Sequence, residues 1–408
     1  MTTSDSEIFI SELAKIPGFK RLLAELEMPK LSDSSNTMLD VFCKKIRKSF
    51  NKYEVEKKSI LKTLKTEGTL NKVREFDIIP KALTKVIDRV CINNYSFTIH
   101  LPSDSSDPGR MFKIYICAPI HFSKSKISNM IRLVSTWFFF VNDFVDNKEC
   151  SKTVDIFLYL IPDKKLLPNH HTTVIDREHV NTAFTTSCQV KTNVYIYREE
   201  EWFRALIHES FHNLGLDFIS MGDSQLKTEE KRINAAFHTN VPDIRLYETY
   251  CEMWAEVLNV LFYVYINRPS QNGLWKSNFF RLFQYEQAFS ILQCAKLLAH
   301  NKMTYSTLDK MGHLFQEKTN SFSYYILKCI LSVHLDKFLH FCSTQFGKDK
   351  YSLQFFKNTP NLQKYTSMII NNHKSTKMNA SIRMIEHAEI THIGLKNTLR
   401  MSLFEITC

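Results

Sequence analysis

The chain has 408 residues, of which 44% are hydrophobic and 23% are charged, and its formal net charge is +11. This balance excludes an intrinsically disordered chain, and the length is sufficient for two lobes or for one large lobe with a helical extension. We therefore expect a chain that is folded throughout.

The first 90 residues are predicted to be helical and basic. Apolar residues recur at spacings of three and four among many lysines, as in Lys44–Lys65. Contact with nucleic acid or an acidic partner is one interpretation of this charge. A solvated helix face is the favoured one, because the chain has neither zinc-finger spacing nor an aromatic stacking module.

A region rich in predicted strands follows the basic helices. The runs are β-branched and aromatic, have the length of strands, and are separated by turn-forming residues. A helix is predicted at Ser123–Asp146, between the second and third runs. The five predicted strands are Tyr95–Leu101, Met111–Ala118, Thr153–Ile161, Val180–Thr186 and Asn193–Arg198.

The remainder of the chain is predicted to be mainly helical from Lys227 to Phe346, and its last segment is not assigned a type. A block of strands followed by a block of helices is typical of an α+β fold, here predominantly helical. The predicted regions are a basic helical region at 1–90, a region with the sheet at 91–225, a helical region at 226–346 and an extension at 347–408.

The cysteines and the apolar stretches indicate a protein that stays inside the cell that makes it. Ten cysteines occur without any CxxC pair, which favours reduced and mostly buried thiols over a disulfide scaffold. The first residues carry acids where a signal peptide has basic ones. The apolar stretches Leu133–Val145 and Val257–Ile266 are too short to span a bilayer and are predicted core helices.

The segment RALIHESFHNLG, Arg204–Gly215, carries the HExxH pattern of a zinc site. Residues four apart share one face of a helix, so the imidazoles of His208 and His212 can converge on one Zn²⁺ ion. Glu209 can then act as general base towards an activated water. Gly215 stands where a helix end favours a left-handed residue, and three glutamates are expected in the first turn, Glu199, Glu200 and Glu201.

Two kinds of third ligand are compatible with this motif. Asp217 lies close to the motif, but it misses by one residue the position that ligates in the HExxHxxGxxH and HExxHxxGxxD patterns, where this chain has Phe218. A later predicted helix offers three acids at spacings of four, Glu248, Glu252 and Glu256. Glu252–Glu256 resembles the ExxA(D/E) arrangement of gluzincins, and this resemblance implies Glu252 as the ligand and Glu256 as the acid behind a ligating histidine. Glu248 with Glu252 behind it is the alternative.

Residues 95–335 resemble a group of zincin-like proteins encoded by large DNA viruses. The resemblance rests on Val180–Phe218, on YETYCEMWAE and on NSFSYYILKCIL. It implies a zincin-like catalytic domain whose strand before the active helix cradles an extended peptide, with Asn181, Ala183 and Phe184 as candidate contacts. It also implies a donor to the reaction's oxyanion, for which Tyr325 is the candidate, followed by Tyr324, Tyr247 and His313.

The sequence thus predicts an intracellular, cytoplasmic zinc metallopeptidase that hydrolyses peptide bonds. If the protein is viral, host cytoplasm or the virion is the expected location, and the expected partner is a protein or peptide substrate. The alternative from another class is a catalytically silent zincin-fold protein with a structural or interaction role. A basic nucleic-acid-associated factor ranks third and is supported by no motif.

Overall fold

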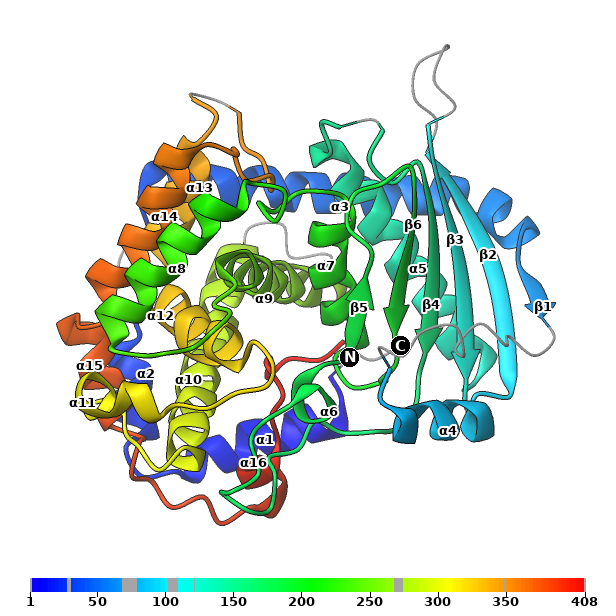
Figure 1. Cartoon of the computed structure of the whole chain (residues 1–408). Helices are drawn as coiled ribbons and strands as arrows, with labels where there is room; N and C mark the ends of the chain where they lie inside the picture. The colour runs from blue at the N-terminus through cyan, green and yellow to red at the C-terminus, as the bar shows by residue number, and fades with distance from the viewer. Residues whose placement is uncertain are drawn as a thin grey trace. The chain divides into compact units, whose positions relative to one another are not determined.

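The computed structural model of the chain (Figure 1) describes residues 2–27, 31–67, 79–101, 109–120, 122–147, 149–267, 274–347 and 350–406. The chain forms two compact units, each assembled from segments that are not contiguous. Unit 1 consists of Met1–Asp40, Lys165–Val180 and Phe218–Glu405, and unit 2 of Val41–Lys164, Asn181–Asp217 and Ile406–Cys408. The predicted α+β, mainly helical class is confirmed. The predicted division into four consecutive regions stays a prediction.

Unit 2 is built on a mixed six-stranded sheet with the order β1-β2-β3-β4-β6-β5. β3, β4 and β6 run parallel, and the other neighbours are antiparallel. The five predicted strands are confirmed, with ends that move by a few residues, whereas the short β1 was not predicted. The strands are β1 (Lys65–Glu67), β2 (Asn93–Leu101), β3 (Arg110–Ala118), β4 (Thr153–Tyr159), β5 (Ala183–Thr185) and β6 (Lys191–Ile196).

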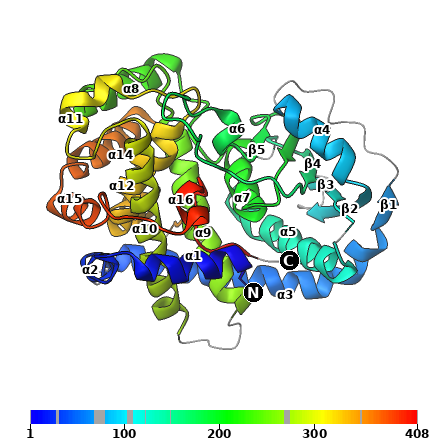
Figure 2. The same cartoon turned by 90° about the horizontal axis from the view of Figure 1, so that it is seen from below.

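Helices cover both faces of this sheet (Figure 2), with α5 (Lys124–Val141) on one face and α4 (Lys81–Val90) on the other. Phe112 of β3 stacks on Phe138 of α5, with ring centroids 4.0 Å apart. Odd-numbered residues of β4 and β6 face the opposite way and pack with Leu83 and Ile87 of α4. Because both faces are covered, the central strands read as nearly continuous apolar runs.

A disulfide joins Cys150, before β4, to Cys188, in the turn between β5 and β6. The expectation that all thiols are reduced is therefore wrong for this pair. Sequence spacing gave no signal, because the two cysteines are 38 residues apart and meet only through the pairing of their strands. The other described cysteines are thiols outside any disulfide, as predicted: Cys43, Cys91, Cys117, Cys251, Cys294, Cys329 and Cys342.

Unit 1 is helical, and α9 (Leu246–Asn267) and α10 (Trp275–His300) form its interior. An aromatic cluster that includes Tyr250, Trp254 and Phe338 packs at the start of α9. Its remaining helices are α1 (Ser4–Lys15), α2 (Phe19–Glu25), the start of α3 (Asp33–Lys62), α6 (Arg177–Val180), α8 (Asp223–Phe237), α11 (Leu308–Met311), α12 (Lys328–Val333), α13 (Leu335–Thr344), α14 (Thr359–Asn372), α15 (Thr376–Arg383) and α16 (Ile393–Asn397).

The segment after α16, which the sequence left unassigned, is extended and buried in unit 1. Glu286 of α10 accepts hydrogen bonds from the Leu403 and Phe404 amides at 2.8 and 2.9 Å and from the Ser402 hydroxyl at 2.7 Å. Burial and the nearby charge of Glu256 raise the pKa of Glu286 to about 7. A buried carboxyl thus satisfies main-chain amides of this segment, which is not part of the sheet.

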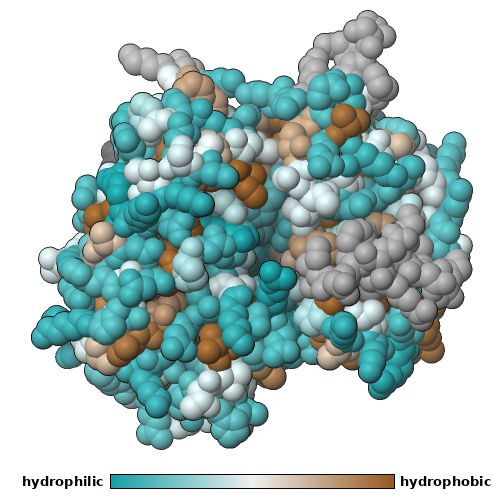
Figure 3. Space-filling model, viewed as in Figure 1, coloured by the Kyte–Doolittle hydropathy of each residue, from teal (hydrophilic) through white to brown (hydrophobic). Residues whose placement is uncertain are grey.

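None of the described helices is long and apolar enough to cross a membrane. The stretches at Leu133–Val145 and Val257–Ile266 lie largely in α5 and α9 and are mostly buried, as predicted. The face of the molecule drawn in Figure 3 is mainly hydrophilic, with hydrophobic residues scattered over it.

The pH dependence of stability tests the packing around His334, which separates α12 from α13. Burial, with the charges of Lys337 and Lys377, lowers the His334 pKa from 6.5 to about 4. Between these values the unfolded chain binds a proton that the folded chain does not, so stability falls as the pH falls, by up to about 1.4 kcal/mol per pH unit. We expect His334→Gln to flatten this slope in urea unfolding series from pH 7 to pH 4. His340→Gln, an exposed control on α13, keeps the wild-type slope. Equal slopes for wild type and His334→Gln would contradict the assignment.

Candidate metal centre

The predicted HExxH helix is α7 (Trp202–Asn213) of unit 2, and all twelve of its residues are buried. The prediction for its end is confirmed, because Gly215 adopts φ +67° and its amide bonds to the His212 carbonyl at 3.2 Å. The prediction for its start is wrong. The three glutamates stand before the first turn, and Glu201 has φ 58° at the cap position. Glu199 instead forms an ion pair with Lys126, with 2.5 Å between the carboxylate oxygen and the ammonium nitrogen.

Hydrogen bonds hold α7 against the rest of unit 2. The Trp137 indole N–H of α5 donates to the Ser210 hydroxyl at 2.9 Å, and that hydroxyl donates to the Leu206 carbonyl at 2.6 Å. At the far end, the Asn213 amide donates to the Thr185 hydroxyl of β5 at 3.1 Å. The helix is therefore held in its middle and at its C-terminal end, which limits the rotation of the histidine-bearing face.

His208 and His212 lie together on this helix, as predicted. Their Nε2 atoms are 3.1 Å apart, and their rings are inclined by 71° with centroids 4.9 Å apart. Two nitrogens that each bind one zinc ion at about 2.0–2.1 Å in tetrahedral geometry lie about 3.3 Å apart. The pair of imidazoles is thus spaced to share one ion, and the described residues that could hold a metal ion include both.

Asp217 has a role that the sequence analysis did not assign to it. Its Oδ2 bonds to Nδ1 of His212, and its side chain is fully buried. A carboxylate on Nδ1 fixes the proton there and leaves the Nε2 lone pair for a metal, as in other carboxylate–histidine–metal arrangements. Within unit 2, Asp217 therefore supports His212, one of the residues that could hold a metal ion. The turn at Gly215 brings Asp217, five residues after His212, back to the helix. The HExxH spacing alone does not predict this contact.

Glu209 precedes the second histidine by three residues and is 8% exposed. Its position next to His208 on the same rigid helix is what a general base for a water at the metal requires. That role stays a prediction.

The predicted substrate strand is an edge of the sheet. Among the described strands β5 pairs only with β6. Bonds from Tyr197 N to Thr182 O and from Thr186 N to Asn193 O show which main-chain groups of β5 point towards β6. In an antiparallel ladder the intervening residues, Ala183 and Thr185, direct their N–H and C=O groups away from β6. Their side chains lie on the face that carries α7.

The other two candidate substrate contacts are arranged differently. The ring of Phe184 stacks on Tyr195 with centroids 4.7 Å apart, on the face covered by α4. Asn181 precedes β5 and is partly buried. Period-two alternation thus turns Phe184 away from the histidine-bearing helix. A direct contact of either side chain with substrate stays a prediction.

The candidate acids Glu248, Glu252 and Glu256 all lie on α9 of unit 1 and are all buried. Glu256 Oε1 accepts from the Lys328 ammonium group at 2.8 Å, and that ammonium group also donates to the Met401 carbonyl at 3.2 Å. Glu256 therefore forms a buried ion pair inside unit 1. Its predicted role behind a ligating histidine stays a prediction, and so does the choice between Glu248 and Glu252.

The predicted oxyanion donor, Tyr325, lies in a short π-helix (Phe322–Leu327) that packs on α9. Its hydroxyl donates to the Leu399 carbonyl at 2.5 Å, and the side chain is 1% exposed. This contact gives the hydroxyl a structural use in unit 1. Tyr324, the next candidate, is 8% exposed, and catalytic roles for both tyrosines stay predictions.

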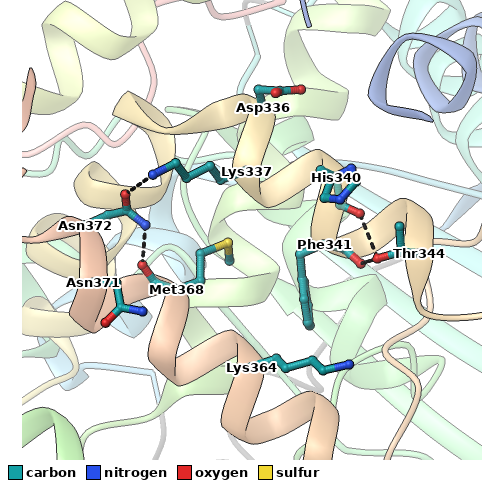
Figure 4. A pocket seen from close by; sticks show the side chains of 9 residues that line it. All are labelled: Asp336, Lys337, His340, Phe341, Thr344, Lys364, Met368, Asn371 and Asn372. Atoms are coloured by element: carbon teal, nitrogen blue, oxygen red, sulfur yellow. Dashed lines mark hydrogen bonds between the residues drawn. The ribbon is translucent and has the colours of Figure 1, made fainter. Parts of the chain in front are cut away.

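A separate pocket of about 470 Å³ lies in unit 1 between α13 and α14 (Figure 4). Lys337 and Lys364 line it, and the Lys337 ammonium group donates to the Asn372 side-chain carbonyl at 2.6 Å. None of the site residues predicted from the sequence lines this pocket.

Comparison of the chain with family models, with curated proteins and with solved structures found no match.

The turn after α7 is tested by Gly215→Ala. A Cβ at this position would lie 3.3 Å from Cys150 Sγ, in a backbone conformation that L-residues rarely adopt. We expect the substitution to lower the free energy of unfolding by about 1–2 kcal/mol in urea titrations. Gly222→Ala is the matched control, because a Cβ there meets nothing closer than 3.9 Å. Equal stability of the two variants would show that the turn is not strained by a side chain.

Proposed function

We propose that the protein is a zinc-dependent metallopeptidase whose metal ligands include His208 and His212. One observation carries the proposal: two buried Nε2 atoms 3.1 Å apart on a single helix, one of them on an imidazole whose Nδ1 bonds to Asp217. Imidazole pairs of this kind suit Zn²⁺, and the Asp217 carboxylate raises the basicity of His212. The spacing of the nitrogens supports the fit of such an ion.

We propose Glu248 of α9 as the third ligand, with Glu252, which the sequence favoured, as the alternative. The support for Glu248 is that it joins His208 and His212 in a group of three buried side chains of the types that hold metal ions. A carboxylate beside two neutral imidazoles leaves a position for water, as catalytic zinc sites require.

A zinc ion at these ligands would acidify a water and polarise the carbonyl of the scissile amide. In the proposed reaction Glu209 takes the proton of this water and returns it to the leaving amine. The edge of β5 positions the substrate, because Ala183 and Thr185 can offer main-chain groups to an extended peptide. The substrate class that follows is a peptide or an unfolded protein segment.

Glu209→Gln tests the enzyme. We expect wild type and variant to bind zinc equally, because the amide keeps the size of the side chain, and we expect cleavage of a peptide library only by wild type. Glu199→Gln, which removes a carboxylate that pairs with Lys126 outside the helix, is the control that retains cleavage. Zinc in both proteins with cleavage in neither would favour a catalytically silent protein of the same fold.

The third ligand is tested by comparing Glu248→Gln with Glu252→Gln. We expect Glu248→Gln to weaken zinc binding by more than the roughly 10- to 100-fold that is typical of changes around a ligand, and Glu252→Gln to have the smaller effect. Zinc affinity is measured by competition with a chelator of known affinity. The reverse order would assign the ligand to Glu252, and unchanged affinity in both would remove α9 from the site.

A further inference from the structure

The Cys150–Cys188 disulfide lies directly against the turn that follows the metal-binding helix. A Cβ added to Gly215 would contact both cysteines, at 3.3 Å from Cys150 Sγ and 3.5 Å from Cys188 Cβ. Cys150 Sγ also lies 3.5 Å from the carbonyl oxygen of Asn213, the last residue of α7. The bridge is thus packed against Asn213 and Gly215, two of the four residues that connect His212 to its partner Asp217.

Hydrogen bonds around the bridge strengthen this connection. The Ser151 hydroxyl donates to the Asn213 carbonyl at 2.6 Å and accepts from the Thr192 hydroxyl at 3.0 Å. The Ser151 amide donates to Gln189 O at 2.6 Å, next to Cys188. Ser151 itself adopts φ 54°, a conformation that a serine keeps only when its surroundings hold it. The bridged segments therefore support the end of α7.

The two bridged residues differ in exposure. Cys150 is 1% exposed, whereas Cys188 is exposed in the turn between β5 and β6. A thiolate from solution therefore approaches the bridge from the side of Cys188. Thiol–disulfide exchange proceeds by attack on an accessible sulfur, so we expect a reductant to attack the bridge at Cys188.

We propose that Cys150–Cys188 is a redox-modification site whose substrate is a dithiol reductant and whose state controls metal binding at His208 and His212. A thiolate of the dithiol attacks Cys188 Sγ, the bond to Cys150 breaks, and Cys150 leaves as a thiolate that takes up a proton. The second thiol of the reductant, as its thiolate, then attacks the mixed disulfide and releases Cys188. Two cysteine thiols and one oxidised dithiol result.

The consequence follows from the path of the chain. Loss of the bridge removes the covalent link between the segment before β4 and the β5–β6 turn, and the two cysteine side chains that pack on Gly215 can then move apart. The turn then holds Asp217 on His212 less firmly, and His212 loses part of the support that orients it. This inference rests on the proposed metal site, but the movement of the turn can be measured without metal.

The test compares oxidised protein with protein reduced by dithiothreitol, which is removed under anaerobic conditions before Zn²⁺ is added. We expect reduction to weaken zinc binding about tenfold, in the range of changes to residues that support a ligand. We also expect faster hydrogen exchange of the Gly215 and Leu216 amides in metal-free protein. Cys188→Ser should match reduced wild type with or without reductant, and Cys43→Ser, at a thiol of α3 outside the bridge, should respond as wild type does.

Equal zinc affinity of the oxidised and reduced proteins would overturn the inference while leaving the metal site intact. If neither form binds zinc, the proposed function fails, and hydrogen exchange then decides whether the bridge controls the turn. Unchanged exchange on reduction would overturn that coupling as well.

Discussion

The bond between His212 and Asp217 is the interaction on which the site depends. Asp217 is fully buried, and a buried carboxylate is costly unless a donor compensates it. The imidazole Nδ1–H supplies that donor and thereby turns the Nε2 atom towards His208, 3.1 Å away. The orientation of the histidine pair is therefore set by a residue outside the HExxH motif, through a turn that only Gly215 adopts without strain.

The surroundings of α7 make this arrangement rigid. All of the helix is buried, its middle is bonded to α5 through Trp137, and its end is bonded to β5 through Asn213. The same end rests on the disulfide-linked segments that precede β4 and β6. One helix of unit 2 thus carries the histidine pair, contacts the sheet edge and rests on the bridge.

The sequence was sufficient for features that depend on local periodicity. Runs of β-branched and aromatic residues predicted the strands of unit 2, and the spacing of four predicted that His208 and His212 share a face. Features that depend on chain reversal or long-range pairing gave no such signal. Asp217 reaches His212 only because of the turn at Gly215, and Cys150 meets Cys188 only because β4 and β6 are neighbours. Likewise, the acids of α9 look equivalent in sequence, but Lys328 of α12 pairs with Glu256.

The most direct measurement of the central claim is the stoichiometry of zinc bound to purified wild type, His208→Ala and His300→Ala. His300 is a buried histidine whose ring nitrogen bonds to the Thr173 carbonyl in unit 1, so its loss controls for the removal of a buried imidazole. The account predicts one zinc ion per chain in wild type and His300→Ala and none in His208→Ala. Zinc retained by His208→Ala, or absent from wild type, would contradict it.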